Sequence, residues 1–421
     1  MMPSPFRWQS GAPPSLADAD WLNAHSTQQI LGILEEAGFE ARIVGGAVRN
    51  ALLGRPVQDL DIATTATPEQ VMTVSERAGL QIVPTGLAHG TVTVVSHGEP
   101  FEVTTLREDV TTDGRRADVR FTAAWEADAR RRDFTINALY CDARGNVFDP
   151  LEGLQDIFNR TLRFIGCPDH RIAEDYLRIL RFFRFFAEYG DGPPDRHALE
   201  ACVRGRHGLR QLSRERVRQE LMKLLVAPRA TASVEAMYNH GLLGAFLPVA
   251  PRINYFARLI GGNPDTSSAV RLATLCLAAA NDAKRISRAL KLSNDEQKEL
   301  QNIAAILHCP PQLPNQHTVR KWIYRYGNKS AQQRVFYLRS ATLSGLADPA
   351  WAALAELAGI WAAPEFPIAG RDILALGIEP GTIVGSTLRQ VEEQWLATDF
   401  KMPRDELLAC AKHLISKDKK N

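Results

Sequence analysis

Hydrophobic residues follow two different spacings along the chain, and the change between them predicts two kinds of structure. Residues 26–38 carry apolar side chains at the spacing of an amphipathic helix, whereas the runs at 81–84, 91–96 and 101–106 are rich in β-formers, with turn residues between them. Beyond Ile165 the pattern has the longer period of helices, interrupted by loops that contain proline. We therefore expect an N-terminal head of strands and helices, followed by a helical remainder.

The length of the chain requires more than one domain. At 421 residues it exceeds what a single compact core supports, so two or three domains are expected. We divide it into a loose N-terminal tail over residues 1–25, a head over 26–150, a hinge and helical neck over 151–230, and a helical body and tail over 231–421.

The stretch from Gly45 to Asp61 has the layout of a site for a metal-bound nucleotide. Gly45 and Gly46 end an apolar run and precede a short helix, so backbone can approach a triphosphate there. Asp59-Leu60-Asp61 then opens a second strand, on which residues two apart share a face. Two convergent carboxylates are what Mg²⁺ needs when phosphates supply its other ligands. A structural turn and a DxD glycosyltransferase site are the alternatives.

Three further segments contribute candidate site residues. Glu102, on the run at 101–106, is a candidate acidic ligand or general base, and an exposed strand glutamate is the alternative. The charged stretch over residues 107–121 predicts a mobile loop. In the next block Arg132 can neutralise phosphate and Asp133 can accept hydrogen bonds from ribose hydroxyls, with a solvated helix start as the alternative.

Asp175 and Arg178, three residues apart, have the hydrogen-bonding character needed to select a nucleobase. We expect both on one face of a helix that begins at Glu174. Asp only accepts and Arg only donates, so the pair complements the exocyclic amine and the ring-nitrogen acceptor of cytosine and adenine, and mismatches uracil and guanine. Two mismatched buried groups cost roughly 2–6 kcal/mol in total. An intrahelical salt bridge is the alternative.

Composition and charge narrow the class of protein. Net charge is only +2, so a nucleic-acid surface must come from local clustering. One cluster spans residues 160–223, where 14 Lys or Arg, 13 of them Arg, outnumber 9 Asp or Glu; ion-paired helix faces are the alternative. Six scattered cysteines without a CxxC pair argue against a disulfide framework or a zinc site and fit a reducing cytoplasm. Without a leader or a membrane-spanning run, a soluble protein is expected.

Seven sequence blocks, in order, resemble the class II tRNA nucleotidyltransferase family, which comprises the CCA-adding enzymes and the related bacterial poly(A) polymerases. The blocks are GGAVRNALLG with DLD, PTGLAHGTVTVV with FEVTTLR, DGRRADVRF, RRDFTINAL, GLQDIFNRTLRFIG, EDYLRILRFFRF and LSRERVRQELMKLL. They cover about residues 40–225, and the C-terminal half matches more loosely, through GRDILALGIEPGTIVGSTL. The resemblance implies an α+β nucleotidyltransferase head with a mixed sheet and flanking helices, followed by an all-α neck, body and tail.

The resemblance also implies a role for each candidate residue. Asp59 and Asp61 would carry catalysis and bind two Mg²⁺ ions, with Glu102 as a further candidate ligand. Gly45, Gly46 and Arg49 would bind the triphosphate, Arg132, Asp133 and Asn137 would bind the ribose, and Asp175 and Arg178 would select the base. Arg181, Arg184, Arg214 and Arg216 would support the neck, and Gly153, Asp156, Arg163 and Gly166 would form the hinge.

The activity that the resemblance implies is the addition of CCA to the 3′ end of tRNA from CTP and ATP, with release of pyrophosphate. A loop resembling the one that permits the switch to ATP is present at residues 113–121, so full CCA addition is favoured over CC-only, A-only or poly(A) activity. The arginines after residue 160 and the helical C-terminal half would read tRNA by shape and backbone. An inactive RNA-binding protein is a distant alternative. Asn50 departs from the family, which usually has Asp there, and the oligomeric state is not indicated.

Overall fold

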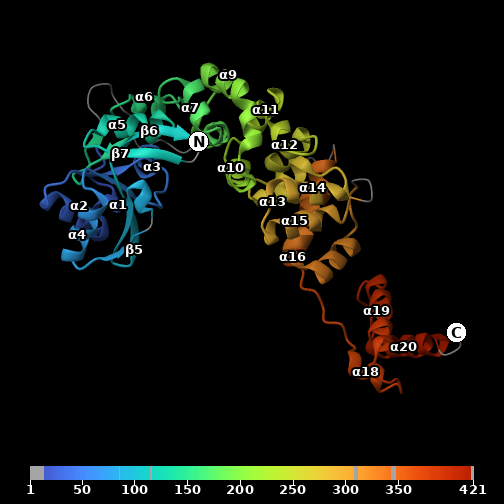
Figure 1. The fold of residues 1–421 in the computed structure, drawn as a ribbon. Coiled ribbons are helices and arrows are strands. Elements are labelled where there is room, and N and C mark those ends of the chain that lie inside the picture. The colour runs from blue at the N-terminus through green and yellow to red at the C-terminus, as the bar shows by residue number, and fades with distance from the viewer. Residues whose placement is uncertain (1–13, 85, 114–115, 308–311, 343–347, 419–421) are drawn as a thin grey trace. The chain divides into compact units, whose positions relative to one another are not determined.

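The structure, a computed structural model, describes the chain apart from residues 1–13, 85, 114–115, 308–311, 343–347 and 419–421 (Figure 1). The chain forms two compact units, Met1–Leu247 and Pro248–Asn421. All strands that the structure describes lie in the first unit, and the second unit, where described, consists of helices and their connections. The predicted fold class, an α+β head followed by an all-α remainder, is confirmed.

A seven-stranded mixed sheet lies at the centre of the first unit. Its order is β3-β4-β5-β2-β1-β8-β9, and neighbouring strands are antiparallel except for the parallel pair β2 and β5. The strands are β1 (Ala41–Val44), β2 (Asp61–Thr64), β3 (Gln81–Val83), β4 (Thr91–Ser96), β5 (Glu99–Thr105), β8 (Tyr140–Cys141) and β9 (Val147–Phe148). Buried and half-exposed residues alternate along β4, as expected for a strand with one face on the core.

The register of the central strands brings two acidic residues together. Asp61, the first residue of β2, pairs with Val44 at the end of β1 and with Glu102 in β5. Directly paired residues project on the same side of a sheet, so both carboxylates lie at the same end of the same face. Along β5, half-exposed Thr104 rather than buried Val103 shares the face of Glu102, as the alternation predicts.

Helices α2 (His25–Glu36) and α4 (Pro68–Arg77) pack on the sheet. Both contact β4, and α4 also contacts β3 and β5. α4 begins with a capping box, in which the side chains of Thr67 and Gln70 each accept the other's backbone N–H, and a proline occupies the first helical position. Helix α2 agrees with the helix expected over residues 26–38.

The rest of the first unit is mainly helical, and α8 supplies much of its core. Phe182, Phe183 and Phe186 of α8 are buried, and the helix packs against α10 and α11. The helices are α1 (Asp20–Asn23), α3 (Gly46–Leu52), α5 (Trp125–Arg130), α6 (Gly153–Phe158), α7 (Pro168–Glu174), α8 (Leu177–Tyr189), α9 (Arg196–Arg204), α10 (Arg214–Val226) and α11 (Ala230–Asn239), with 3₁₀ turns at Leu87–His89, Thr135–Asn137, Gly205–Gln211 and Leu243–Ala245.

The second unit contains helices α12 to α20. They are α12 (Ile253–Gly262), α13 (Ser268–Cys276), α14 (Ala280–Leu290), α15 (Asn294–Ala304), α16 (Gln316–Ala341), α17 (Pro349–Ile360), α18 (Gly370–Leu374), α19 (Thr382–Ala397) and α20 (Arg404–Asp418). Helices α18 to α20 share a core that includes Ile373, Trp395 and Leu407. Among the described helices, none is long and apolar enough to cross a membrane.

Residues 107–121 differ from the sequence prediction. The stretch was expected to be a mobile loop, but its described residues form an antiparallel ribbon of β6 (Arg107–Asp113) and β7 (Arg116–Phe121), so the loop prediction was wrong. The physical reason is visible in the pattern, because Val and Thr are interspersed among the charged residues. A two-stranded ribbon does not require a continuous apolar face. The high density of charged residues therefore led to the prediction of a loop where the chain forms two strands.

Two smaller expectations can be compared with the structure. Residues 14–25, assigned from the sequence to the N-terminal tail, include α1 and the buried side chains of Leu16 and Leu22. The cysteines that the structure describes (141, 167, 202, 276 and 410) are free thiols, in agreement with their scattered spacing, and Cys309 lies outside the described residues.

Candidate active site

A cleft of about 450 Å³ in the first unit, called the main cleft below, gathers most of the predicted site residues. It is lined by Gly45, Gly46, Arg49, Asp61, Arg132, Asp133, Asn137, Asp175, Arg178, Arg181 and Phe185. These residues come from Gly45 and the helix α3 that follows it, the start of β2, the block after α5, and the segment from the end of α7 into α8. Groups more than a hundred residues apart in the sequence therefore face one space.

Gly45 ends β1 in a conformation that glycine adopts most readily, with φ +71° and ψ −110°. A β-carbon at this position would lie 3.4 Å from the carbonyl oxygen of Asn137 and 3.6 Å from the guanidinium of Arg132. The turn thus lets the start of α3 pack closely against residues 132–137, and it leaves bare backbone on the cleft wall.

Arg49 is buried and held by three side chains. It donates to Asn137 Oδ1, to Asn50 Oδ1 from Nε (3.2 Å) and Nη2 (3.0 Å), and to the Tyr189 hydroxyl (2.8 Å). Burial lowers the pKa of Arg49. Asn50, where the resembling family usually has Asp, donates from Nδ2 to the Pro56 carbonyl (3.2 Å). An ionised carboxylate could not donate this bond, so Asn suits its surroundings.

Asp59 and Asp61 line a second cleft of about 610 Å³ together with Glu102. Asp61 lines the main cleft as well, so the two clefts meet at its side chain. All three carboxylates are exposed, and none forms an ion pair within the part of the chain that the structure describes. Partial withdrawal from water and the nearby charge of Glu102 raise the pKa of Asp61.

The donor set at this junction fits a divalent cation. The three carboxylates concentrate negative charge that no neighbouring cation pairs with in the described chain. Carboxylate oxygens are the ligands that Mg²⁺ prefers, and the ion commonly takes only one or two of them, together with substrate phosphates. Among the described residues no group of three or more His, Cys, Asp or Glu is arranged to hold a metal, so the protein alone does not supply a complete set of ligands and the substrate phosphates would have to supply the others.

Arg132 is fixed on the wall of the main cleft by Asp128, a residue that the sequence reasoning missed. Buried Asp128 accepts from Arg132 Nε (3.2 Å) and Nη2 (3.0 Å), from Arg131 Nε (2.8 Å) and from the Tyr140 hydroxyl (2.8 Å). Burial alone would lower the pKa of Arg132, but the charge of Asp128, the interaction with Tyr140 and the hydrogen bonds to both together outweigh burial and raise it. The spacing of four residues between the two could have revealed the pair.

Asp133 links the main cleft to α8. Its Oδ1 accepts from the Phe134 N–H (2.9 Å) and from Asn137 Nδ2 (3.0 Å), and its Oδ2 accepts from Arg181 Nε (2.8 Å) and Nη2 (2.6 Å). Burial alone would raise the pKa of Asp133, but Arg181 and these hydrogen bonds hold it below the ordinary value. Protein donors thus occupy about all of its acceptor positions.

The segment predicted to be a hinge packs directly against the block that carries Asp133. A β-carbon on Gly153 would lie 2.3 Å from the Thr135 carbonyl oxygen. Asp156 accepts from the Thr135 hydroxyl and, at 3.1 and 2.9 Å, from Arg163 Nε. Gly166 follows with a φ of +75°. These contacts hold the block in place, and hinge motion stays a prediction.

Asp175 and Arg178 both line the main cleft, but they do not share a helical face. The prediction of a helix that begins at Glu174 is wrong. Helix α7 ends at Glu174, Asp175 is extended (φ −153°, ψ 107°), and α8 begins at Leu177. The cause is local: Asp175 Oδ1 accepts from the Leu177 N–H (3.0 Å), a bond by which Asp interrupts a helix. Its Oδ2 accepts from Arg216 Nη2 (2.5 Å).

Known proteins resemble the chain over most of its length. The CCA tRNA nucleotidyltransferase 1, mitochondrial, of Danio rerio is 36% identical over 388 residues, which cover 90% of this chain and 88% of that protein. The CCA-adding enzyme of Leuconostoc mesenteroides is 33% identical over 92% of this chain and 96% of its own length. The chain belongs to the class II tRNA nucleotidyltransferase family.

Domain-level comparisons agree with this assignment. The family model described as the poly A polymerase head domain matches residues 41–163. The model described as the probable RNA- and SrmB-binding site of polymerase A matches residues 194–253, and the model described as tRNA nucleotidyltransferase domain 2, putative, matches residues 264–411. The crystal structure of the Bacillus stearothermophilus CCA-adding enzyme in complex with CTP has a TM-score of 0.74 and 27% identity, and the match covers 94% of this chain and 98% of that one. The predicted family and enzyme class are confirmed, and membership implies the use of a divalent metal.

In this family member, Glu174 holds Arg178 in position. Glu174 accepts from Arg178 Nη1 and from Arg171 Nη1, and Arg178 also donates to the Arg171 carbonyl (2.7 Å). Sequence reasoning missed Glu174, although it precedes Arg178 by the four residues of an i, i+4 pair. The guanidinium of Arg178 is therefore oriented before any base arrives.

Three of the four arginines predicted to support the neck form ion pairs in this nucleotidyltransferase. Arg184 Nε donates to Glu220 Oε2 (2.5 Å), and Arg181 Nη1 lies 3.6 Å from Glu220 Oε1. Arg216 pairs with Asp175, as described above. Arg214 is the first residue of α10 and forms no ion pair within the described part of the chain. Glu220 lies 36 residues or more from its partners, so no local spacing could have revealed it.

Proposed function

We propose that this chain adds CCA to the 3′ end of tRNA, using CTP twice and ATP once and releasing pyrophosphate each time. The observation that carries the proposal is the main cleft, in which the Gly45–Gly46 turn and Asp61 face Asp175 and Arg178. The relatives named as CCA-adding enzymes, and the Bacillus relative in complex with CTP, support it. tRNA, CTP and ATP are then its partners.

Asp59 and Asp61 are the proposed ligands of two Mg²⁺ ions. When bound, such ions would lower the pKa of the attacking 3′ hydroxyl and neutralise charge on the pyrophosphate. The exposed, unpaired carboxylates where the two clefts meet support this assignment. Glu102, which pairs with Asp61 across β2 and β5, is assigned the role of a further ligand or of a base for the hydroxyl proton.

The wall formed by Gly45, Gly46 and Arg49 is the proposed triphosphate site. Bare backbone at the glycine turn permits close approach, and Arg49 is held in place by three side chains on the protein side. Arg132 is the proposed ribose and phosphate contact, and Asp133 places Asn137 and Arg181 beside it. Positioning and charge neutralisation then do most of the catalytic work.

Base selection is assigned to Asp175 and Arg178. Each is held by a neighbour, Asp175 by Arg216 and Arg178 by Glu174, so both present fixed polar groups to the main cleft. A carboxylate oxygen would accept from the exocyclic amine of cytosine or adenine, and a guanidinium N–H would donate to the adjacent ring nitrogen. Uracil and guanine present the opposite polarity at both positions and would be rejected.

The cytoplasm is the proposed setting of this activity. The described cysteines are free thiols, and three of them, Cys141, Cys202 and Cys276, are buried, which suits a reducing compartment. Burial raises the pKa of the Cys141 thiol to about 12, so this thiol is unreactive in the folded protein.

Incubation with radiolabelled CTP and ATP and a tRNA transcript that lacks its last three nucleotides tests the proposal. The expected product is three nucleotides longer than the transcript. Asp61→Ala should abolish incorporation and retain tRNA binding, whereas Glu76→Gln, on the exposed side of α4, should behave as the unmodified chain. A long adenylate tail would indicate a poly(A) polymerase instead, and full activity of Asp61→Ala would refute the metal assignment.

A further inference from the structure

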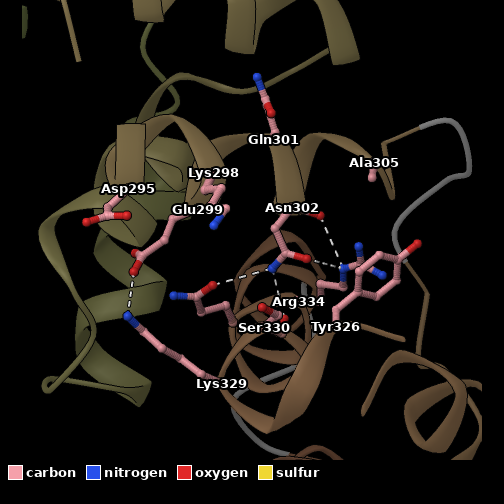
Figure 2. Close-up of a pocket in the computed structure, with 11 residues that line it drawn as sticks. Asp295, Lys298, Glu299, Gln301, Asn302, Ala305, Tyr326, Lys329, Ser330 and Arg334 are labelled. Carbon is pink, nitrogen blue, oxygen red and sulfur yellow. Dashed lines mark hydrogen bonds and ion pairs between the residues drawn. The ribbon is translucent and has the colours of Figure 1, made fainter. Parts of the chain in front are cut away.

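A groove of about 630 Å³ lies between α15 and α16 in the second unit, and no residue assigned a role above lines it. Figure 2 shows its lining. The side chains that matter below are Lys298, Glu299 and Asn302 of α15 and Tyr326, Lys329 and Arg334 of α16. The volume is within the range of sites that enclose one nucleotide-sized ligand.

One wall of the groove is a half-exposed aromatic ring supported from beneath. The guanidinium of Arg334 lies 4.1 Å from the ring centroid of Tyr326, so it covers one face of the ring (Figure 2). Arg334 is only 3% exposed, and its Nε donates to Asn302 Oδ1 (2.9 Å) and to the Asn302 carbonyl (3.2 Å). Tyr326 itself is 49% exposed. The ring is thus held rigidly on one side and open to a ligand on the other.

A kink in α16 presents this ring. Gly327, directly after Tyr326, has φ +80° and ψ 163°, a conformation that side chains rarely adopt. Asn328 fixes the kink, because its Nδ2 donates to the Ala358 carbonyl (3.0 Å) and the Trp361 carbonyl (2.9 Å) at the end of α17. A straight helix would change the direction of Tyr326, so the exposed ring is built into the backbone.

Two exposed lysines lie beside the ring. α16 carries six Lys or Arg and neither Asp nor Glu, but Arg320 and Arg325 pair with Asp399 and Glu393. Only Lys329 and Arg334 of the six line the groove, together with Lys298 and the acidic residues Asp295 and Glu299 of α15. In the groove, Lys329 pairs with Glu299 (2.6 Å) yet remains 77% exposed, and Lys298 is exposed on α15. Exposed aromatic rings beside Lys side chains are how proteins commonly hold unpaired nucleotides, with the base stacked and the phosphate neutralised.

We propose that this groove binds an unpaired nucleotide of the tRNA, with its base stacked on the open face of Tyr326 and its phosphate beside Lys298 and Lys329. The proposal rests on the proposed function for the identity of the RNA. Arg334 supports the ring rather than contacting the RNA. Stacking tolerates any base, so the groove would contribute affinity for tRNA without selecting a sequence.

The test is the affinity of the full chain for the tRNA transcript, measured by filter binding. Tyr326→Ala should weaken binding about tenfold, and Tyr326→Phe, which keeps the ring, should bind within about twofold of the unmodified chain. Tyr326→Phe thus serves as the matched control, because it removes only the hydroxyl group. Unchanged affinity in Tyr326→Ala, or an equal loss in Tyr326→Phe, would overturn the stacking site.

A second measurement tests the phosphate contact without disturbing the ring. Lys298→Gln should lower the slope of log affinity against log salt by about 0.7–0.9, the contribution of one released counterion, and an unchanged slope would contradict the contact. At saturating tRNA, Tyr326→Ala should incorporate CTP at the rate of the unmodified chain. If the unmodified chain incorporates no nucleotide, the proposed function is refuted. The comparison of tRNA affinities between the Tyr326 variants still tests whether the groove binds RNA.

Discussion

Asp133→Asn should destabilise the first unit strongly while changing almost no volume. In the unmodified chain Arg181 donates to Asp133 at 2.8 and 2.6 Å. The substituted Asn can keep one acceptor oxygen toward Asn137, but it turns an N–H₂ group toward Arg181, which then has no acceptor there. Removing one partner of a buried ion pair costs about 3–5 kcal/mol, and the partial burial of this pair places the cost at the lower end of that range. Glu220, 3.6 Å from Arg181, still compensates part of the charge, so we expect about 3 kcal/mol.

Thermal unfolding measures this loss. For a unit of this size 1 kcal/mol corresponds to about 2–4 °C, so the melting temperature of the first unit should fall by about 6–12 °C. The whole chain has two units and need not unfold in one step, so its transitions are compared between variants. Glu200→Gln removes a solvent-exposed ion pair with Arg196 and should change the melting temperature little. A change within 1 °C for Asp133→Asn would refute the reasoning.

The pH dependence gives the same prediction an independent check. The pKa of Asp133 is lowered in the folded protein, so the ion pair contributes its full stability above the ordinary carboxyl value, about 4, and loses it as the pH falls through the lower folded pKa. The difference in melting temperature between Asp133→Asn and the unmodified chain should therefore be constant near neutrality and shrink below about pH 4. A difference that grows in acid would contradict the assigned charge state.

Three further outcomes are expected. Asp175→Ala should raise incorporation of UTP relative to CTP about tenfold, since one mismatch of about 1.4 kcal/mol disappears, and unchanged discrimination in a nucleotide competition assay would remove the base-selecting role. Gly153→Ala should lower the free energy of unfolding by about 1–3 kcal/mol, because its added methyl group would collide with Thr135. Gly32→Ala, whose methyl group would meet nothing within 4 Å on α2, should leave the free energy of unfolding unchanged or raise it by up to about 1 kcal/mol. Equal effects of the two substitutions in thermal unfolding would contradict the packing argument. Chelation of divalent metal should stop nucleotide incorporation and added Mg²⁺ should restore it, so activity that survives chelation would exclude a metal at Asp61.

Local patterns were sufficient where neighbouring residues determine the geometry. The glycine turn at Gly45 and the place of Asp61 at the start of the next strand are readable from a short stretch of sequence. Asp59 was expected on the same strand, but β2 begins at Asp61, so strand alternation does not place Asp59. The β-register then adds Glu102, whose place opposite Asp61 follows from a parallel pairing that the sequence suggested only through an isolated acidic residue.

Prediction from spacing failed where a side chain competes with the backbone. Asp175 and Arg178 are three apart, which predicts one helical face, yet Asp175 bonds to the Leu177 N–H and divides the helix. Both residues still line the main cleft, so the expected neighbours were right and the geometry was wrong. Arg216, which holds Asp175, lies 41 residues away and depends on how α10 packs against α8.

The groove between α15 and α16 lay beyond sequence reasoning for a similar reason. Tyr326 is exposed because a glycine kink turns the helix, and Arg334 reaches the ring because Asn302 of another helix holds it. Neither contact has a characteristic local spacing. The helical period of α16 predicted a helix, but its kink requires the tertiary contacts of Asn328.

The 3′ ends made from a mixture of nucleotides test the central claim most directly. The full chain would be given equal concentrations of CTP, ATP, UTP and GTP with a tRNA transcript that lacks its last three nucleotides, and the products would be sequenced. A single cleft that joins the chemistry at Asp61 to base selection at Asp175 and Arg178 predicts CCA as the dominant addition. Ends rich in U or G, or long runs of A, would contradict it.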